Sequence, residues 1–359
     1  MKVINLSLDN KILDKNSAVA QRAISYGALL DEYLIVLVGK NQNVNLSAKT
    51  KVVAMAATNK FFTLFKIYKY LLAKLSVNKY DIITIQDTYY LAFLGLFLGK
   101  KFHIKVELQV HGFEKLSGLR KFLAKYNLKR ADTIRVVSQR LKDKIVSEFS
   151  VEAKKLYIVP VAIDKDHLIA LQDGFNLKEQ YPNNFIFLTV SRLVPIKNIA
   201  MQIRALSQIK NDNIKLVIVG EGPEENNLKN LVSQLGLSDK VEFSGAWVEH
   251  LASYYQSADC LLLSSNSEGY GMVVAEAVLA GLPVIMTEVG VAGELLENNV
   301  NGLVVPVADE QSFTQAMMRV IEEDSLLQKF SANSIAFKDK ILDKEQLINK
   351  VVEHWQTIL

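Results

Sequence analysis

The chain has 359 residues, of which 50% are hydrophobic and 22% are charged. This length suits two domains of ordinary size, and the apolar share is large enough for two cores, which excludes a disordered chain. The single cysteine, Cys260, excludes an internal disulfide and indicates a reducing, cytoplasmic compartment. Its apolar neighbours predict that Cys260 is a core residue.

The net charge of +4 conceals an uneven distribution. Residues 1–150 carry 25 Lys and Arg against 11 Asp and Glu, whereas the remainder carries 17 against 27. A strongly basic first half predicts an anionic contact, with a membrane surface, a phosphorylated acceptor or a nucleic acid as candidates. Residues 1–8 lack the pattern of a signal peptide, and the apolar stretch at 91–98 is too short to span a bilayer, so we expect a soluble or surface-bound protein.

Short apolar runs alternate with helical patterns along the chain. In the first half, strands are expected at 3–6, 34–38, 82–85, 104–108 and 133–137, and helices at 17–30, 60–78, 88–99 and 117–129. After a polar connection at 164–184, strands are expected at 185–190, 216–219, 260–263, 283–286 and 303–305. Residues 334–359 are expected to form a last helix. Buried strands separated by helices predict parallel sheets, and two such series predict two doubly wound domains.

The stretch from Ser264 to Pro283 is the most informative for function. A strand ends near Ser264, a turn with two glycines follows, and a helix is expected from Gly271 to about residue 280. The free N–H groups at such a helix start suit a diphosphate. Glu268 and Glu276, separated by seven residues, could accept hydrogen bonds from a hexose and a ribose. The alternative is an ordinary strand–helix crossover that contains two glutamates.

Two other loops carry candidate residues. Arg192 and Lys197 follow the end of a strand, where ligands bind in doubly wound sheets, and Pro195 stiffens their loop. The alternative is that both are solvated loop cations. Residues 219–225 superficially resemble a dinucleotide fingerprint, but they carry glutamates where that motif needs a glycine and a helix entry, so we do not expect a nicotinamide cofactor there.

Taken together, these motifs resemble the C-terminal domain of retaining GT-B glycosyltransferases of family four. The resemblance covers about 185–310 and includes the glutamate pair, the Arg-x4-Lys pair, the run from Gly220 to Pro223, and 241–245. It implies an α/β GT-B fold with two Rossmann-like doubly wound domains that face a cleft. Residues 1–165 would bind the acceptor, 166–337 would bind a nucleotide-sugar, and a C-terminal helix at 338–359 would cross back to the first domain.

The resemblance also implies a role for each matching residue. Arg192 and Lys197 would bind the diphosphate, Glu276 the ribose, and Glu268 the donor sugar. His111, which follows a strand, would contact the donor sugar, although a lone histidine is also often structural. The catalytic set would be His111, Arg192, Lys197 and Glu268. The remaining donor contacts would come from Gly269, Tyr270, Gly271, Met272 and Val273, and the base would lie near Gly245, Ala246 and Trp247.

Two segments depart from the pattern of the family. Residues 8–17 lack the paired glycines that many relatives have near the acceptor, and 160–164 lack an asparagine that is common at the hinge. The acceptor contacts and the contacts to the base are therefore expected to differ.

The implied activity is transfer of a hexosyl group from a UDP- or GDP-linked sugar to a hydroxyl of a glycan or lipid-linked acceptor, with retention, in cell-envelope glycan biosynthesis. Neither a metal nor another cofactor is expected. The alternatives are a GT-B-type sugar-nucleotide epimerase and a non-catalytic nucleotide-sugar-binding protein; no motif favours nucleic acid. Basic amphipathic segments at 59–79 and 115–130 could lie on an anionic membrane at the inner face, or could be solvated faces of helices that cover the sheet.

Overall fold

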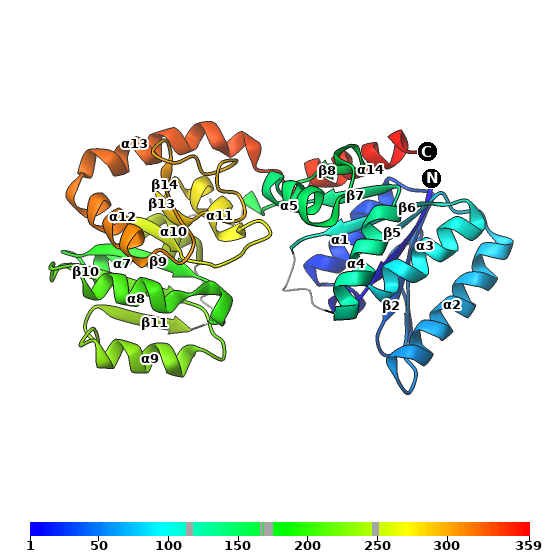
Figure 1. Ribbon diagram of the computed structural model, residues 1–359, viewed down its shortest axis with the longest axis horizontal. Helices are drawn as coiled ribbons and strands as arrows, with labels where there is room; N and C mark the ends of the chain where they lie inside the picture. The colour runs from blue at the N-terminus through cyan, green and yellow to red at the C-terminus, as the bar shows by residue number, and fades with distance from the viewer. Residues whose placement is uncertain (113–117, 166–167, 169–174, 246–250) are drawn as a thin grey trace. The chain divides into compact units, whose positions relative to one another are not determined.

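The computed structural model describes residues 1–112, 118–165, 168, 175–245 and 251–359. Within these ranges the chain folds into two compact units (Figure 1). Unit 1 comprises Met1–Pro160 and Lys344–Leu359, and unit 2 comprises Val161–Asp343. The last helix of the chain therefore belongs to the first unit, as the sequence led us to expect.

The sheet of unit 1 has the strand order β3-β4-β2-β1-β5-β6-β7-β8, and β3 alone runs antiparallel to its neighbour. Its strands are β1 (Lys2–Ser7), β2 (Glu32–Val38), β3 (Gln42–Asn45), β4 (Thr50–Met55), β5 (Ile82–Ile85), β6 (Lys105–Val110), β7 (Thr133–Val136) and β8 (Leu156–Ile158). Its helices are α1 (Ala18–Ala28), α2 (Lys60–Val77), α3 (Tyr90–Phe102), α4 (Gly118–Arg130), α5 (Gln139–Phe149) and α14 (Lys344–Thr357), with short turns η1 (Asn10–Leu13) and η2 (Ala153–Lys155).

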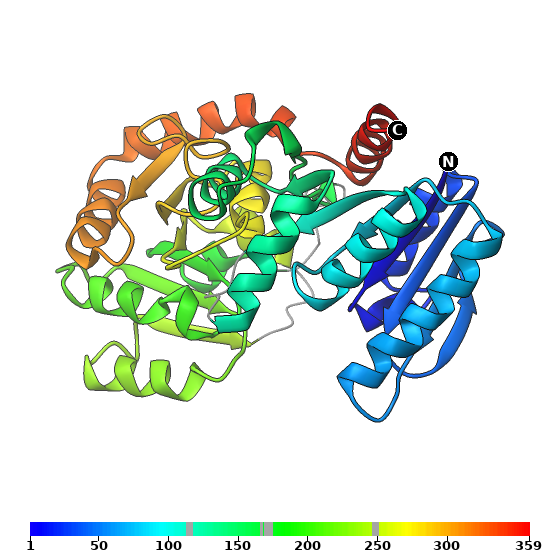
Figure 2. The ribbon, with the colours of Figure 1, turned by 45° about the vertical axis from the view of Figure 1, so that its right-hand side comes forward.

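The two faces of this sheet are covered by different helices. Helices α2, α3 and α4 lie side by side over one face (Figures 1 and 2). Helix α3 comes close to the strands because Gly95 and Gly99 face Ile85 and Val106 without a Cβ between them. On β6, Val106 alternates with Glu107, so Glu107 points to the opposite face, where α14 covers it through Trp355.

The sheet of unit 2 is entirely parallel, with the order β11-β10-β9-β12-β13-β14. Its strands are β9 (Phe185–Val190), β10 (Ile214–Val219), β11 (Val241–Gly245), β12 (Cys260–Leu263), β13 (Val284–Thr287) and β14 (Gly302–Val305). Its helices are α7 (Leu177–Gln180), α8 (Ile199–Ser207), α9 (Glu225–Gln234), α10 (Leu251–Ser257), α11 (Met272–Ala280), α12 (Glu310–Glu322) and α13 (Asp324–Ser334), with short turns η3 (Pro195–Lys197) and η4 (Ile335–Lys340).

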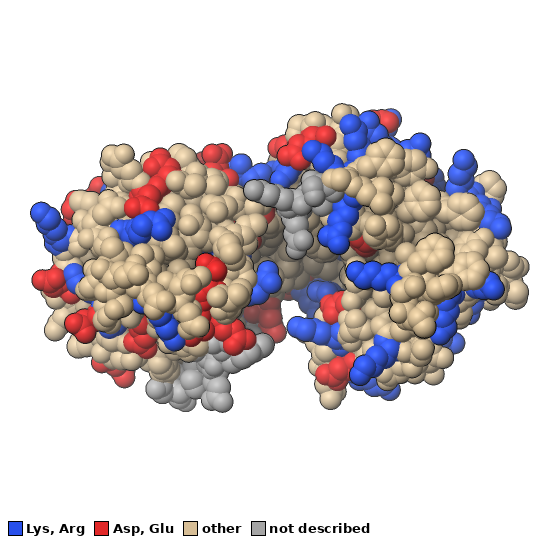
Figure 3. All heavy atoms as spheres, turned by 60° about the horizontal axis from the view of Figure 1, so that its bottom comes forward, with Lys and Arg blue, Asp and Glu red and all other residues tan. Residues whose placement is uncertain are grey.

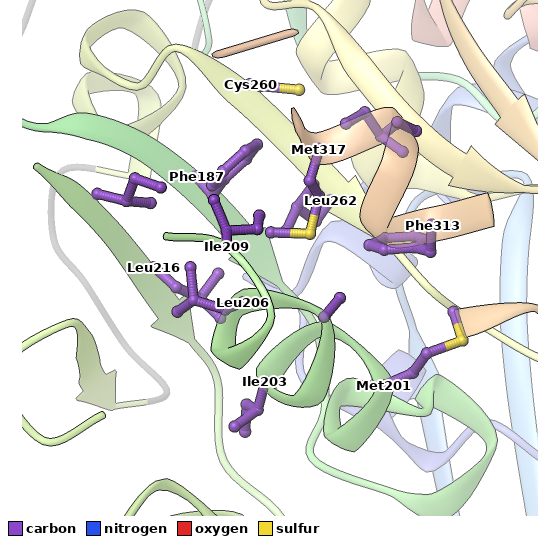
Figure 4. Packing of buried hydrophobic residues seen from close by; sticks show 14 of the residues in the cluster. Phe187, Met201, Ile203, Leu206, Ile209, Leu216, Cys260, Leu262, Phe313 and Met317 are labelled. Atoms are coloured by element: carbon purple, nitrogen blue, oxygen red, sulfur yellow. The ribbon is translucent and has the colours of Figure 1, made fainter. Parts of the chain in front are cut away.

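A hydrophobic core fills the space between this sheet and helices α8 and α12 (Figure 4). Phe187 and Leu262 approach it from the strands, and Phe313 and Met317 approach it from α12. Cys260 is fully buried in the same core, and burial raises the pKa of its thiol. The expected core role of this cysteine is confirmed.

The expectation of one continuous helix over 334–359 is wrong. Helix α13 ends at Ser334, the turn η4 follows, and Ile341 is extended before α14 begins. Phe337 and Ile341 belong to unit 2, whereas Trp355 is buried in unit 1, so the apolar positions serve two cores. Because one straight helix serves a single core, the chain must break where it passes from unit 2 to unit 1.

Candidate active site

The strand order of unit 2 reverses at its centre. From β9 the chain continues outward through β10 and β11, and then returns to the other side of β9 to form β12. The connections that leave β9 and β12 therefore flank a topological switch point, the place where open α/β sheets bind ligands. The β9 connection carries Arg192 and Lys197, and the β12 connection carries Glu268.

A predicted cation and a predicted carboxylate meet at this point. The Lys197 ammonium lies 2.5 Å from Glu268 Oε1, and the Ser265 hydroxyl donates to the same oxygen at 2.7 Å. The Lys197 and Glu268 side chains are only 17% and 13% exposed. The turn η3, which begins with Pro195, directs Lys197 toward Glu268. The ion pair is thus a largely buried feature of the switch point and not a surface pair.

Buried polar groups hold the two connections together. Gln202 of α8 donates to Ser264 Oγ at 2.9 Å, and this hydroxyl lies 2.9 Å from the carbonyl of Lys197. The N–H of Asn266 donates to the carbonyl of Ile196 at 2.8 Å. Sequence reasoning assigned no role to Gln202, which the structure shows to be buried among the apolar residues of α8.

Helix α11 begins directly after the glutamate-bearing turn. Gly271 is its N-cap with a φ of 97°, and no side chain caps this helix end. The helix start therefore keeps the arrangement of N–H groups that suits an anion. Farther along, the Tyr255 hydroxyl donates to Glu276 at 2.5 Å, and burial raises the pKa of Glu276. Tyr255 was not among the residues that the sequence predicted.

The turn before α11 is braced by the connection that follows β13. A Cβ on Gly290 would lie 2.1 Å from the carbonyl oxygen of Tyr270, and the N–H of Val291 donates to that oxygen at 2.9 Å. The Thr287 hydroxyl donates to the carbonyl of Ser265 at 2.6 Å. Gly290 therefore permits a close backbone approach that fixes the turn, a role that only the folded chain reveals.

The glycines of the run from Gly220 to Pro223 have a structural explanation. A Cβ on Gly220 would lie 1.8 Å from the carbonyl oxygen of Ser191, and a Cβ on Gly222 would lie 2.3 Å from that of Leu193. These glycines let the β10 connection pack directly on the connection that carries Arg192. Their role at the candidate site is therefore structural, because they allow one backbone segment to pack directly against another.

The structure locates only some of the remaining predicted residues of unit 2. Arg192 is exposed on the β9 connection, and Gly245 ends β11, where its carbonyl accepts from the N–H of Gly220 at 2.7 Å. Ala246 and Trp247 lie outside the described residues.

Among the residues that the structure does describe, no three His, Cys, Asp or Glu gather as a metal site would require. Metal independence stays a prediction.

His111 lies in unit 1, directly after β6, and part of the residue remains exposed. Its pKa is lowered to about 4, because partial withdrawal from water disfavours the charged ring and because Arg135 and Arg22 repel a further positive charge. His111 is therefore neutral at pH 7. A neutral imidazole can donate one hydrogen bond and accept another, as a contact to a sugar hydroxyl requires.

The low pKa of His111 predicts how acid affects folding. Between about pH 6.5 and pH 4 the unfolded chain binds a proton at this position that the folded chain does not bind. The free energy of unfolding is therefore expected to fall as the pH is lowered through this window, and to fall less in a His111→Gln variant. Urea unfolding at pH 7.5, 5.5 and 4.5 measures this, and equal losses in the two proteins would contradict a depressed pKa.

Comparison with known proteins agrees with this geometry. A family described as Glycosyl transferases group 1 matches residues 175–337, and Glycosyltransferase Family 4 matches residues 43–167, so together they span most of the chain. The chain is 28% identical, over 80% of its length and 78% of the relative, to N-acetylgalactosamine-N,N'-diacetylbacillosaminyl-diphospho-undecaprenol 4-alpha-N-acetylgalactosaminyltransferase of Campylobacter jejuni.

A second relative is the Escherichia coli UDP-Gal:alpha-D-GlcNAc-diphosphoundecaprenol alpha-1,3-galactosyltransferase, 27% identical over 61% of this chain and 58% of the relative. Among solved structures, Anabaena HepE in complex with UDP superposes with a TM-score of 0.81 at 20% identity, over 99% of this chain and 100% of that one. This likeness establishes the GT-B fold. The chain therefore belongs to the family-four glycosyltransferases, with the group 1 domain in its second unit.

Proposed function

We propose that this enzyme transfers a hexosyl group from a UDP- or GDP-linked sugar to a hydroxyl of a glycan or lipid-linked acceptor, with retention at the anomeric carbon. The observation that carries the proposal is the largely buried ion pair of Lys197 and Glu268 at the switch point of unit 2, beside the start of α11. It joins a cation suited to phosphate with a carboxylate suited to sugar hydroxyls.

In the proposed mechanism, the bond between the anomeric carbon and the diphosphate oxygen breaks while negative charge grows on the leaving diphosphate. Lys197, Arg192 and the N–H groups at the start of α11 would stabilise that charge. Because these groups are fixed before the reaction, they would favour the transition state over the ground state. Glu268 would hold the sugar together with the backbone of 269–273, and Glu276 would hold the ribose.

The same proposal assigns the base and the acceptor. The base would lie beyond β11, near Gly245 and the neighbouring Ala246 and Trp247. His111 would contact the donor sugar from unit 1, which would also bind the acceptor. The two relatives named above carry diphospho-undecaprenol in their names, which supports a lipid-linked acceptor. Action in the cytoplasm, attached peripherally to the inner face of a membrane, belongs to the proposal.

A panel of UDP- and GDP-sugars in a thermal-shift assay tests donor binding. We expect at least one of them, with UDP-hexoses favoured, to raise the melting temperature by several degrees at saturation, with no change on adding EDTA. Turnover with acceptor should then release nucleoside diphosphate and give a larger product. An epimerase would instead change the sugar nucleotide without acceptor, and a binding protein would do neither. A panel in which no sugar nucleotide binds would contradict the proposal.

A further inference from the structure

Unit 1 exposes large apolar side chains on three neighbouring helices. On α2, Phe61 is 74% exposed, and on α4, Phe122 is 66% exposed. The full set on these helices near their N-terminal ends is Phe61, Phe62, Phe65, Tyr90, Phe93, Phe97, Leu119 and Phe122. Side chains of this size are rarely grouped on the surface of a soluble monomer unless the surface binds a partner.

Ring contacts connect the three helices. Phe65 and Tyr68 of α2 have centroids 6.5 Å apart, and Tyr68 contacts Phe97 of α3 at 6.1 Å. Phe93 of α3 contacts Tyr126 of α4 at 5.8 Å. We call this surface of α2, α3 and α4 the aromatic face. It is continuous across the three helices and is not a set of isolated side chains.

The aromatic face is surrounded by positive charge. Helices α2, α3 and α4 contain no Asp or Glu; α2 and α4 carry Lys or Arg beside the rings, whereas the lysines of α3, Lys100 and Lys101, lie in its last turn. Exposed cations stand among the rings, with Lys60, Lys66 and Lys69 on α2 and Arg120, Lys121 and Lys125 on α4. Figure 3 shows unit 1 with many lysine and arginine side chains around a broad uncharged area. Three helices without a single carboxylate suit an anionic partner.

The position of the face within unit 1 relates it to His111. Its exposed rings lie toward the N-terminal ends of the helices, except for Phe97, which lies just past the middle of α3, and each helix follows a strand of the parallel sheet. The face therefore lies at the edge where β4, β5 and β6 have their carboxyl ends. His111 leaves β6 at that same edge.

We infer that the aromatic face docks unit 1 on an anionic lipid bilayer. The phenyl rings enter the boundary between headgroups and acyl chains, and the surrounding lysines and arginines bind the anionic headgroups. A bilayer explains both features of the face, since its apolar rings and the cations of α2 and α4 meet apolar and anionic layers at one surface. No helix within the described ranges is long and apolar enough to cross a membrane. The inference rests on the proposed function in one respect only, the lipid-linked acceptor. This acceptor would reach the sheet edge that carries His111 from the bilayer.

Vesicle flotation with the full-length protein tests the inference. We expect the wild-type protein to float with phosphatidylcholine vesicles that contain phosphatidylglycerol. Replacing one ring per helix, in Phe61→Ser/Phe93→Ser/Phe122→Ser, should lower the partition coefficient at least about tenfold. Removing three cations, in Lys60→Gln/Arg120→Gln/Lys121→Gln, should lower it on the order of a hundredfold at low salt.

Two matched variants control for general changes. Val77→Ser/Leu235→Ser/Ile335→Ser removes exposed apolar side chains outside the face. Lys79→Gln/Lys100→Gln/Lys101→Gln removes as many charges from unit 1 near the opposite helix ends. Both should float like the wild-type protein. The inference would be overturned if the wild-type protein did not float at low salt. It would also be overturned if the ring or cation variant lost no more vesicle binding than its matched control. In either case a partner protein would be the remaining occupant of the aromatic face.

Nucleotide binding separates this result from a failure of the proposed function. The ring variant should keep the thermal shift with the donor, because its substitutions lie in unit 1. A Glu268→Gln variant should float like the wild-type protein even if transfer is lost. Flotation without any nucleotide binding would therefore refute the proposed activity and leave the docking surface intact.

Discussion

The Arg192→Ala/Lys197→Ala enzyme is expected to lose at least about a thousandfold in kcat/KM for sugar transfer. Removing one preorganised group that stabilises transition-state charge typically costs about a hundredfold to a thousandfold in kcat. Two cations on one connection would act on the same diphosphate, so their joint removal should be severe. The rate of nucleoside diphosphate release at subsaturating donor measures the effect.

The Lys197 substitution needs a separate control for folding. Lys197 neutralises Glu268, which is only 13% exposed, so its loss leaves a largely buried carboxylate without its cation. Arg192→Ala alone avoids this problem, because Arg192 is exposed, and should still cost at least about a hundredfold. As a matched control, Lys229→Ala/Arg319→Ala removes one lysine and one arginine from surface pairs of the same unit. Unchanged transfer by the folded Arg192→Ala/Lys197→Ala enzyme would defeat the assignment.

Local sequence patterns were sufficient for much of unit 2. The expected strands at 185–190 and 260–263 coincide with β9 and β12, because fully buried parallel strands form continuous apolar runs. The turn before α11 was also predictable from its glycines, because glycine readily adopts the positive φ that Gly271 has at the start of this helix. The strand order was not predicted; the pairing of β12 with β9 in the structure is what brings Lys197 and Glu268 into contact.

What the sequence did not reveal depends on pairings over long distances. Gln202 and Ser264 are 62 residues apart, and each is unremarkable until the other is placed beside it. Gly290 needs its lack of a side chain only because Tyr270 folds against it. The strands β3, β4, β8 and β11 were not predicted. The edge strand β3 is polar and mostly exposed, so it lacks the apolar pattern that identified the predicted strands.

The same limit applies to a buried polar cluster in unit 1. Glu107 is fully buried on β6, where Trp355 donates to it at 2.8 Å and Thr84 at 2.6 Å. Tyr157 also donates to this carboxylate, and Arg135 lies 3.6 Å away. Trp355 is 248 residues from Glu107 in the chain. The carboxylate thereby attaches the last helix to the first sheet, which no local pattern could have indicated.

Replacing Arg135 by methionine is expected to lower the stability of unit 1 by about 3–5 kcal/mol, because it leaves Glu107 as a buried charge without its cation. The chain has two tryptophans, so in a Trp247→Phe background the fluorescence of Trp355 reports the unfolding of unit 1. Urea unfolding followed at this tryptophan measures the loss. Lys144→Met, which breaks an exposed pair with Glu148 in the same unit, should cost less than about 0.5 kcal/mol.

A second substitution distinguishes loss of the cation from loss of packing. Glu107→Gln keeps an acceptor oxygen for Trp355 and Tyr157, presents an amide NH2 to the Thr84 hydroxyl, which can accept, and removes the charge that needs Arg135. Added to Arg135→Met, it should therefore restore at least about 2 kcal/mol of stability. If the double variant is as unstable as Arg135→Met alone, the loss comes from packing around the arginine side chain. In that case the hydrogen bonds of Glu107, and not its pairing with Arg135, attach the C-terminal helix to unit 1.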